Sequence, residues 1–183
     1  MAKLILVTGA ARSGKSEWAE QLAADSGKPV IYIATAQENL EDLEWQARIE
    51  KHRSRRPEIW QTRSIPVKLS SAIVDSSASD CLLIDSLGTW LANVLDQTEA
   101  EWQETLDTLF QSFDRTESLI IFVAEETGWG VVPAYPIGRL FRDRLGNLVR
   151  ELGAIADTVY LVAGGHVLNL SQLGTPLKSY PQK

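Results

Sequence analysis

The chain has 183 residues, of which 44% are hydrophobic and 23% are charged, as is ordinary for a soluble globular protein. This length predicts a single domain over 1–183, with a Pro- and Lys-containing tail over 174–183 that we expect to be poorly ordered. The net charge of -6 disfavours a nucleic-acid-binding surface, which needs clustered Lys and Arg. The chain has no apolar stretch of membrane-spanning length and no signal-peptide pattern, so we expect a cytoplasmic protein without membrane contact.

Apolar, β-branched runs alternate with helical segments along the chain. The predicted strands are 3–8, 30–34, 81–85, 118–124 and 157–163, followed by a short edge strand over 166–170. The predicted helices are 15–26, 40–54, 66–75, 87–95, 99–114 and 137–154. The strands are continuous hydrophobic runs, which is typical of strands that helices cover on both faces. The pattern predicts an α/β fold with a mainly parallel central sheet, helices on both faces, and ligands at the carboxyl ends of the strands.

The first strand leads into Gly9-Ala10-Ala11-Arg12-Ser13-Gly14-Lys15-Ser16, which fits the phosphate-loop pattern G-x-x-x-x-G-K-[ST]. The strand before it and the helix after it distinguish this loop from a Gly-containing turn with a solvated lysine. In a phosphate loop the backbone N–H groups and the helix N-terminus face the anion. Lys15 is then expected to reach the β- and γ-phosphates, and the Ser16 hydroxyl to ligate Mg²⁺. We therefore expect the chain to bind a nucleoside triphosphate.

Asp85 ends the predicted strand 81–85, as the second acidic motif of P-loop enzymes does. A carboxylate at that strand tip can hold Mg²⁺ or its waters opposite Ser16. The alternative is that Asp85 is the N-cap of the helix that begins near Leu87.

The single cysteine, Cys81, begins the same strand, so we expect it to be buried and the chain to have no disulfide framework.

His52 lies in the basic stretch Lys51-His52-Arg53-Ser54-Arg55-Arg56. The neighbouring cations disfavour the imidazolium form, which keeps the ring nucleophilic, and they attract phosphates. A neutral imidazole that attacks an α-phosphorus forms a covalent nucleotidyl-histidine. Composition alone favours the alternative, an exposed histidine among solvated cations. His166, the other histidine, is predicted to be a turn or edge-strand residue.

Further motifs run through nearly the whole chain. They are Val7–Ser16, Tyr32–Ala36, Arg48–Ile49 with His52, Arg56–Pro57, Trp60 and Thr62, Asp85–Leu87 with Trp90, Leu91 and Asn93, Glu126, Gly128, Gly130–Pro133, Phe141–Asp143 and Gly146. The blocks over 52–62 and 126–133 are more specific than the phosphate loop, which many kinases share. In these motifs the chain resembles the bifunctional adenosylcobinamide kinase/adenosylcobinamide-phosphate guanylyltransferase family of cobalamin biosynthesis.

This resemblance implies a two-step enzyme with a RecA-like P-loop fold. ATP or GTP would first phosphorylate the aminopropanol hydroxyl of adenosylcobinamide. GMP from GTP would then pass through His52 to that phosphate, which gives adenosylcobinamide-GDP. The implied nucleotide contacts are the Gly9–Ser16 loop, Ala34, Thr35, Ala36, Arg53, Ser54, Arg55, Arg56 and Asp85. Lys15 and His52 are the implied catalytic residues, Ser16 and Asp85 would hold Mg²⁺, and a homotrimer is expected.

Three positions depart from the family pattern. Ala10 replaces a usual second glycine, which is a mild change if φ there is negative. Ser64 stands where a nucleotide-contacting glutamate is common. Glu125 replaces an asparagine before Glu126, which adds a negative charge near a phosphate-rich site. The last two departures bear on nucleotide preference and on the kinase step.

Residues 126–133 are expected to form a loop beside the nucleotide, with Trp129 either as an apolar face for a large corrinoid or as an exposed or core aromatic. Two other functions stay open. One is a monofunctional P-loop small-molecule kinase in which His52 is a bystander. The other is a non-catalytic RecA-like nucleotide-binding assembly protein, which would need a water-positioning glutamate and leaves the His52 block unexplained.

Overall fold

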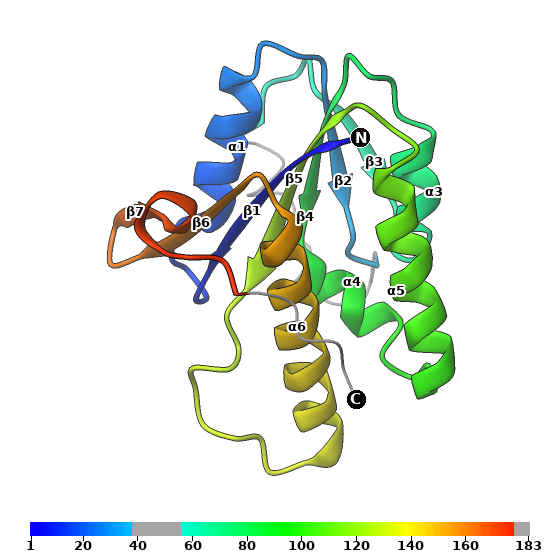
Figure 1. Ribbon diagram of the computed structural model, residues 1–183, viewed down its shortest axis with the longest axis vertical. Helices are drawn as coiled ribbons and strands as arrows, with labels where there is room; N and C mark the ends of the chain where they lie inside the picture. Colours follow the sequence, from blue (N-terminus) through cyan, green and yellow to red (C-terminus); the bar gives the residue numbers. More distant parts are fainter. Residues whose placement is uncertain (38–55, 178–183) are drawn as a thin grey trace.

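The computed structural model describes residues 1–37 and 56–177 (Figure 1). Its elements are β1 (Lys3–Gly9), α1 (Lys15–Asp25), β2 (Val30–Ala34), β3 (Gln61–Ser64), α3 (Leu69–Val74), β4 (Cys81–Asp85), α4 (Leu87–Asn93), α5 (Glu99–Phe113), β5 (Leu119–Glu125), α6 (Pro136–Ile155), β6 (Thr158–Ala163), β7 (His166–Asn169) and α7 (Leu170–Leu173). The strands form one sheet in the order β3-β2-β4-β5-β1-β6-β7. Neighbouring strands are parallel except β6 and β7, which pair antiparallel. The predicted α/β fold with a mainly parallel sheet is confirmed.

Helices cover both faces of the sheet (Figure 1). On one face, Ala19 and Ala23 of α1 belong to a buried cluster with Ile121 of β5. On the other face, helices α3 to α6 contribute to a larger cluster that includes Ile120 and Phe122 of the same strand. Successive residues of β5 thus face opposite cores, because side chains alternate along a strand. This double burial explains why the strands are continuous hydrophobic runs.

The five predicted central strands all form, and each begins and ends within one residue of its predicted bounds. The predicted edge strand over 166–170 forms as β7 at 166–169, and His166 lies on it with its side chain exposed, as expected. Cys81 is buried, and burial is the main cause that raises the pKa of its thiol to about 11. The predicted helix over 40–54 and residues 178–183 of the predicted tail lie outside the described residues.

The sequence did not predict β3, the edge strand over 61–64. Its four residues, Gln-Thr-Arg-Ser, are polar and mostly exposed, so they lack the apolar run that reveals a buried strand. The predicted helix over 66–75 is shorter, at Leu69–Val74. Within the described ranges, we find no helix that is both long and apolar enough to cross a membrane.

Candidate nucleotide-binding site

Glycine is required at two positions of the loop between β1 and α1. A Cβ on Gly9 would lie 2.5 Å from the Val162 carbonyl oxygen and 2.6 Å from Ser13 Oγ, so no larger residue fits there. Gly14 has a φ of 94°, in the left-handed region that a side chain disfavours. The two glycines therefore give the loop the tight backbone path that a phosphate cradle needs.

Lys15, the first residue of α1, folds back over this loop. Its side chain is only 9% exposed, and Nζ donates a hydrogen bond of 3.3 Å to the Ala10 carbonyl oxygen. The alternative of a solvated lysine is therefore wrong.

Ala10, which replaces a glycine in the loop, is exposed and has a negative φ, so the missing glycine introduces no strain at this position. Arg12 does adopt a positive φ, of 60°, at the exposed tip next to Ala11.

The sheet register brings the tips of β1, β5, β4 and β2 to one edge. Gly9 pairs with Glu125, and Asp85 pairs with Val123 on one side and with Ala34 on the other. Because these strands are parallel, the tip of β4 lies one strand away from the phosphate loop, with β5 between them. The predicted loop and the predicted carboxylate therefore share the carboxyl edge of the sheet, where α/β folds bind ligands.

The Asp85 carboxylate is hydrogen-bonded to a tyrosine on the neighbouring strand β2. Tyr32 Oη donates a hydrogen bond of 3.0 Å to Asp85 Oδ2. Burial, and then the charge of Asp85, raise the pKa of the Tyr32 hydroxyl well above its usual range, so this group stays a donor. The N-cap of α4 is Ser86, whose hydroxyl accepts from the Thr89 N–H. The alternative that Asp85 is the cap is therefore wrong, and its carboxylate remains a candidate for Mg²⁺.

Thr35, a predicted nucleotide contact, is fully buried between the tips of β2 and β4. Its hydroxyl donates to the Ser86 carbonyl oxygen at 2.8 Å and accepts from the Ser86 N–H at 2.9 Å. Asn93 of α4 donates to the Thr35 carbonyl oxygen at 2.7 Å. The side chain of Thr35 thus fixes the backbone around the site, while its neighbours Ala34 and Ala36 are half-buried at the same edge.

Two glutamates lie at the end of β5, Glu125 as its last residue and Glu126 directly after it. Glu125 accepts hydrogen bonds from Ser86 Oγ at 2.5 Å and from the Gly88 N–H at 2.9 Å, at the N-terminus of α4. Its charge is therefore matched by the partial positive charge of a helix N-terminus. Glu126 Oε1 accepts from the Thr8 hydroxyl at 2.7 Å, and its N–H donates to the Gly9 carbonyl oxygen at 3.0 Å. The 126–133 loop thus begins against the phosphate loop, as predicted.

The predicted nucleophile, His52, lies outside the described residues, as do Arg53, Ser54 and Arg55. Arg56 is described. Its guanidinium carbon lies 3.8 Å from the centre of the Tyr32 ring, and its Nη1 donates to the Thr62 hydroxyl at 3.2 Å. One member of the predicted basic stretch therefore lies next to the residue that holds Asp85.

The side chains present fit a magnesium ion that is shared with a nucleotide. Mg²⁺ in such sites takes one or two protein oxygens and completes its octahedron with phosphate oxygens and waters. Ser16, the second residue of α1, and Asp85 provide two such oxygens at the carboxyl edge of the sheet. Among the residues described, Asp85 Oδ1 accepts no hydrogen bond, and His, Cys, Asp and Glu form no cluster of three or more that would hold a metal alone.

The sequence matches one family model over residues 5–170, described as cobinamide kinase / cobinamide phosphate guanyltransferase. The chain belongs to this family. It is 38% identical, over 96% of its own length and 98% of the relative's, to the bifunctional adenosylcobalamin biosynthesis protein CobP of Pseudomonas aeruginosa. It is 37% identical to the bifunctional adenosylcobalamin biosynthesis protein CobU of Escherichia coli, over 88% and 96% of the two chains. The resemblance inferred from the motifs is confirmed.

Solved structures of much lower identity share the fold of this cobinamide kinase family member. A Pyrococcus horikoshii protein, PH0250, is 8% identical with a TM-score of 0.58, over 99% of this chain and 94% of that one. A prototypical ATPase of the bacterial type III secretion system is 11% identical with a TM-score of 0.54, over 93% of this chain and 53% of that one. The likeness to this ATPase, with the sheet order and the phosphate loop, supports the RecA-like P-loop fold.

The sequence placed Tyr32 and Thr8 only within motifs, and Glu126 in a loop expected beside the nucleotide, without a contact for any of the three. The structure places them at the phosphate loop or at Asp85. Tyr32 and Thr8 lie inside hydrophobic strand runs, where a polar side chain is expected to be structural. The signal that could have found them is their position near the carboxyl end of a strand, next to a recognised motif.

Proposed function

We propose that this protein is a bifunctional transferase of cobalamin biosynthesis. It phosphorylates adenosylcobinamide with ATP or GTP, and then transfers GMP from GTP to the resulting phosphate to give adenosylcobinamide-GDP. The observation that carries this proposal is the phosphate loop with Lys15 folded over it and Asp85 at the same sheet edge, in a chain that matches the family model over 5–170. The substrates follow from the family's description, not from a contact in the structure.

In the kinase step, the loop N–H groups and Lys15 hold the β- and γ-phosphates. The substrate hydroxyl oxygen attacks the γ-phosphorus, the bond from that phosphorus to the bridging oxygen breaks, and the nucleoside diphosphate leaves. Mg²⁺, held by Ser16 and Asp85, would neutralise the phosphate charge. Glu126 is our candidate acceptor for the hydroxyl proton, because its carboxylate lies beside the phosphate loop through its bond to Thr8.

In the guanylyl step, a neutral ring nitrogen of His52 attacks the α-phosphorus of GTP and pyrophosphate leaves. The phosphate oxygen of adenosylcobinamide phosphate then attacks the same phosphorus, and the P–N bond breaks to free the histidine. Arg53, Ser54, Arg55 and Arg56 would neutralise and orient the phosphates. The contact of Arg56 with Tyr32, whose hydroxyl bonds to Asp85, supports the view that this basic stretch serves the same nucleotide.

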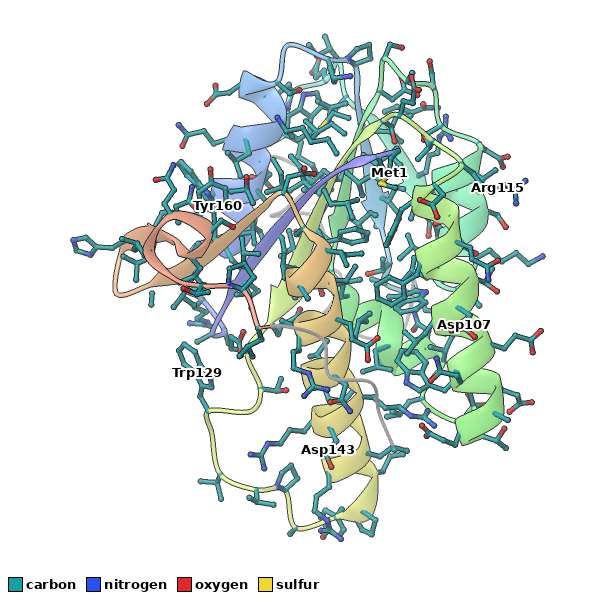
Figure 2. All side chains as sticks on the ribbon, in the orientation of Figure 1. Met1, Asp107, Arg115, Trp129, Asp143 and Tyr160 are labelled. Atoms are coloured by element: carbon teal, nitrogen blue, oxygen red, sulfur yellow. The ribbon has the colours of Figure 1, made fainter. Side chains whose placement is uncertain are left out.

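The segment that follows Glu126 is our candidate surface for the corrinoid. Trp129 is 68% exposed and projects from the loop after β5 (Figure 2). Val131 and Tyr135 of the same segment are also exposed. Arg139 and Arg142 of α6 donate hydrogen bonds to backbone carbonyls of this segment, which restrains it. An apolar surface anchored next to the phosphate loop suits a large macrocycle whose hydroxyl has to reach the γ-phosphate.

The remaining parts of the proposal concern the cell and the assembly. We propose a cytoplasmic homotrimer that uses Mg²⁺ and acts on no nucleic acid. Sedimentation equilibrium of the purified protein, with and without GTP, tests the assembly state. A monomer under both conditions would contradict the homotrimer.

Product analysis tests both activities. The protein is incubated with adenosylcobinamide and ATP, then with GTP, and the corrinoid products are separated and weighed by mass spectrometry. We expect adenosylcobinamide phosphate first and adenosylcobinamide-GDP second. A phosphate product alone would indicate the monofunctional kinase. Nucleotide binding without any product would indicate the non-catalytic assembly protein.

A further inference from the structure

Tyr32 contacts two candidate site residues with different parts of one side chain. Its hydroxyl donates to Asp85 Oδ2 at 3.0 Å, while the face of its ring lies 3.8 Å from the guanidinium carbon of Arg56. The side chain is 4% exposed, within the cluster on the α1 face of the sheet. A side chain so enclosed has little freedom to reorient, so both contacts have a defined geometry.

The sheet register explains how one tyrosine reaches both partners. Tyr32 pairs with Leu83 on β4, two residues before Asp85, so Tyr32 and Asp85 are diagonal neighbours on one face of the sheet. On its other side Tyr32 pairs with Thr62 of β3, which accepts a hydrogen bond from Arg56. Arg56 therefore contacts residues of both β2 and β3, and Tyr32 is the residue that it shares with Asp85.

The two contacts of Tyr32 can each orient a charged group, the Asp85 carboxylate through the hydroxyl and the Arg56 guanidinium through the ring. A tyrosine hydroxyl that donates to one carboxylate oxygen leaves the other oxygen for a cation or its waters. Hydrogen bonds of this kind orient metal-ligating carboxylates, and their loss weakens metal binding by about 10- to 100-fold. An aromatic face fixes the plane of a guanidinium, and the planar guanidinium is a group that recognises phosphate oxygens.

We propose that Tyr32 is a positioning residue that orients the Asp85 carboxylate toward the magnesium ion and the Arg56 guanidinium toward the phosphates of the same nucleotide. This inference rests on the proposed nucleotide site. It assigns separate tasks to the hydroxyl and to the ring, so two substitutions separate them. Tyr32→Phe removes the hydroxyl and keeps the ring, whereas Tyr32→Leu removes both.

The first measurement is Mn²⁺ binding to the protein–GTP complex by electron paramagnetic resonance, with Mn²⁺ in place of Mg²⁺. We expect Tyr32→Phe to weaken Mn²⁺ binding by about tenfold. If the hydroxyl acts through Asp85, the double variant with Asp85→Asn should bind Mn²⁺ no more weakly than Asp85→Asn alone. Tyr160→Phe is the matched control, since Tyr160 is a half-buried tyrosine of β6 whose ring makes an edge-to-face contact with Trp18.

The second measurement is GTP affinity without metal, by calorimetry in the presence of EDTA. Tyr32→Phe should bind GTP as the unsubstituted protein does, and Tyr32→Leu should bind it several-fold more weakly, because Arg56 loses its support. Melting temperatures establish that each variant is folded under the conditions used. The inference would be overturned if Tyr32→Phe bound Mn²⁺ as tightly as the unsubstituted protein. It would also be overturned if the double variant lost Mn²⁺ affinity by the product of the two single-variant losses. Failure of the unsubstituted protein to bind GTP would instead refute the proposed function.

Discussion

Glu125 is expected to stabilise the fold by holding the N-terminus of α4. Its carboxylate accepts from the Gly88 N–H at 2.9 Å and from Ser86 Oγ at 2.5 Å, and both donors belong to buried residues. Glu125→Ala removes the acceptor of both. A buried donor that loses its partner costs about 1–3 kcal/mol. The Ser86 hydroxyl can turn to Thr89 Oγ1, 3.1 Å away, whereas the Gly88 N–H has no such substitute.

We therefore expect Glu125→Ala to lower the free energy of unfolding by about 2 kcal/mol. For a chain of this size that corresponds to a fall in melting temperature of about 4–8 °C. Thermal unfolding by circular dichroism measures it. Glu125→Gln keeps one acceptor oxygen and should lose less than half as much. Glu117→Ala is the control, because this exposed glutamate lies just before β5, and its removal should change the stability by less than about 0.5 kcal/mol.

Equal melting temperatures for Glu125→Ala and Glu117→Ala would refute this reasoning. A large loss of kinase activity with unchanged stability would also refute it, since Glu125 would then act on the substrate. A carboxylate near phosphates is unfavourable unless another positive charge offsets it. The bonds to α4 explain why the fold accepts the charge here.

The other predictions test individual side chains. Lys15→Ala should lower both transfer activities by about 10²- to 10³-fold without a change in melting temperature, because the lysine stabilises charge on the phosphates; full activity would refute the phosphate-loop assignment. Asp85→Asn should raise the Mg²⁺ concentration needed for half-maximal rate, and unchanged kinetics at limiting Mg²⁺ would remove Asp85 from the metal site. Gly9→Ala should abolish GTP binding in calorimetry, because its Cβ would lie 2.5 Å from the Val162 carbonyl oxygen. The Cys81 thiol, with a pKa of about 11 and no exposure, should resist thiol-specific labelling at pH 8 in the native protein and react promptly in denaturant.

The parts of the fold that the sequence predicted are those with a strong local signal. The apolar runs of the five central strands and the glycines of the phosphate loop are dictated by burial and by backbone geometry, which are visible in one chain. The edge strand Gln61–Ser64 escaped prediction because it pairs through its backbone and buries little apolar surface. Strand pairing of this kind depends on a neighbour that sequence alone does not place.

In the candidate site, too, the sequence predicted the residues that have a local motif and missed the contacts between distant residues. The phosphate loop and Asp85 were predicted from motifs, because their chemistry requires those residue types at the ends of strands. The contacts of Tyr32 with Asp85, and of Glu125 with Ser86, connect residues on neighbouring strands and on α4. Such contacts follow from sheet register, which places residues far apart in sequence side by side. The Asp85 cap was a reasonable alternative from sequence, and only the hydrogen bonds of Ser86 exclude it.

In the mechanism that we propose, His52 carries GMP during catalysis. The most direct measurement is incubation with GTP labelled at the α-phosphate, followed by intact mass measurement of the protein. We expect one adduct of GMP size that acid removes and alkali does not, since P–N bonds to imidazole are acid-labile. His52→Asn should abolish the adduct and spare phosphorylation of adenosylcobinamide, whereas His166→Asn, at an exposed histidine on β7, should leave both intact. Persistence of the label in His52→Asn, or loss of kinase activity together with it, would contradict the account.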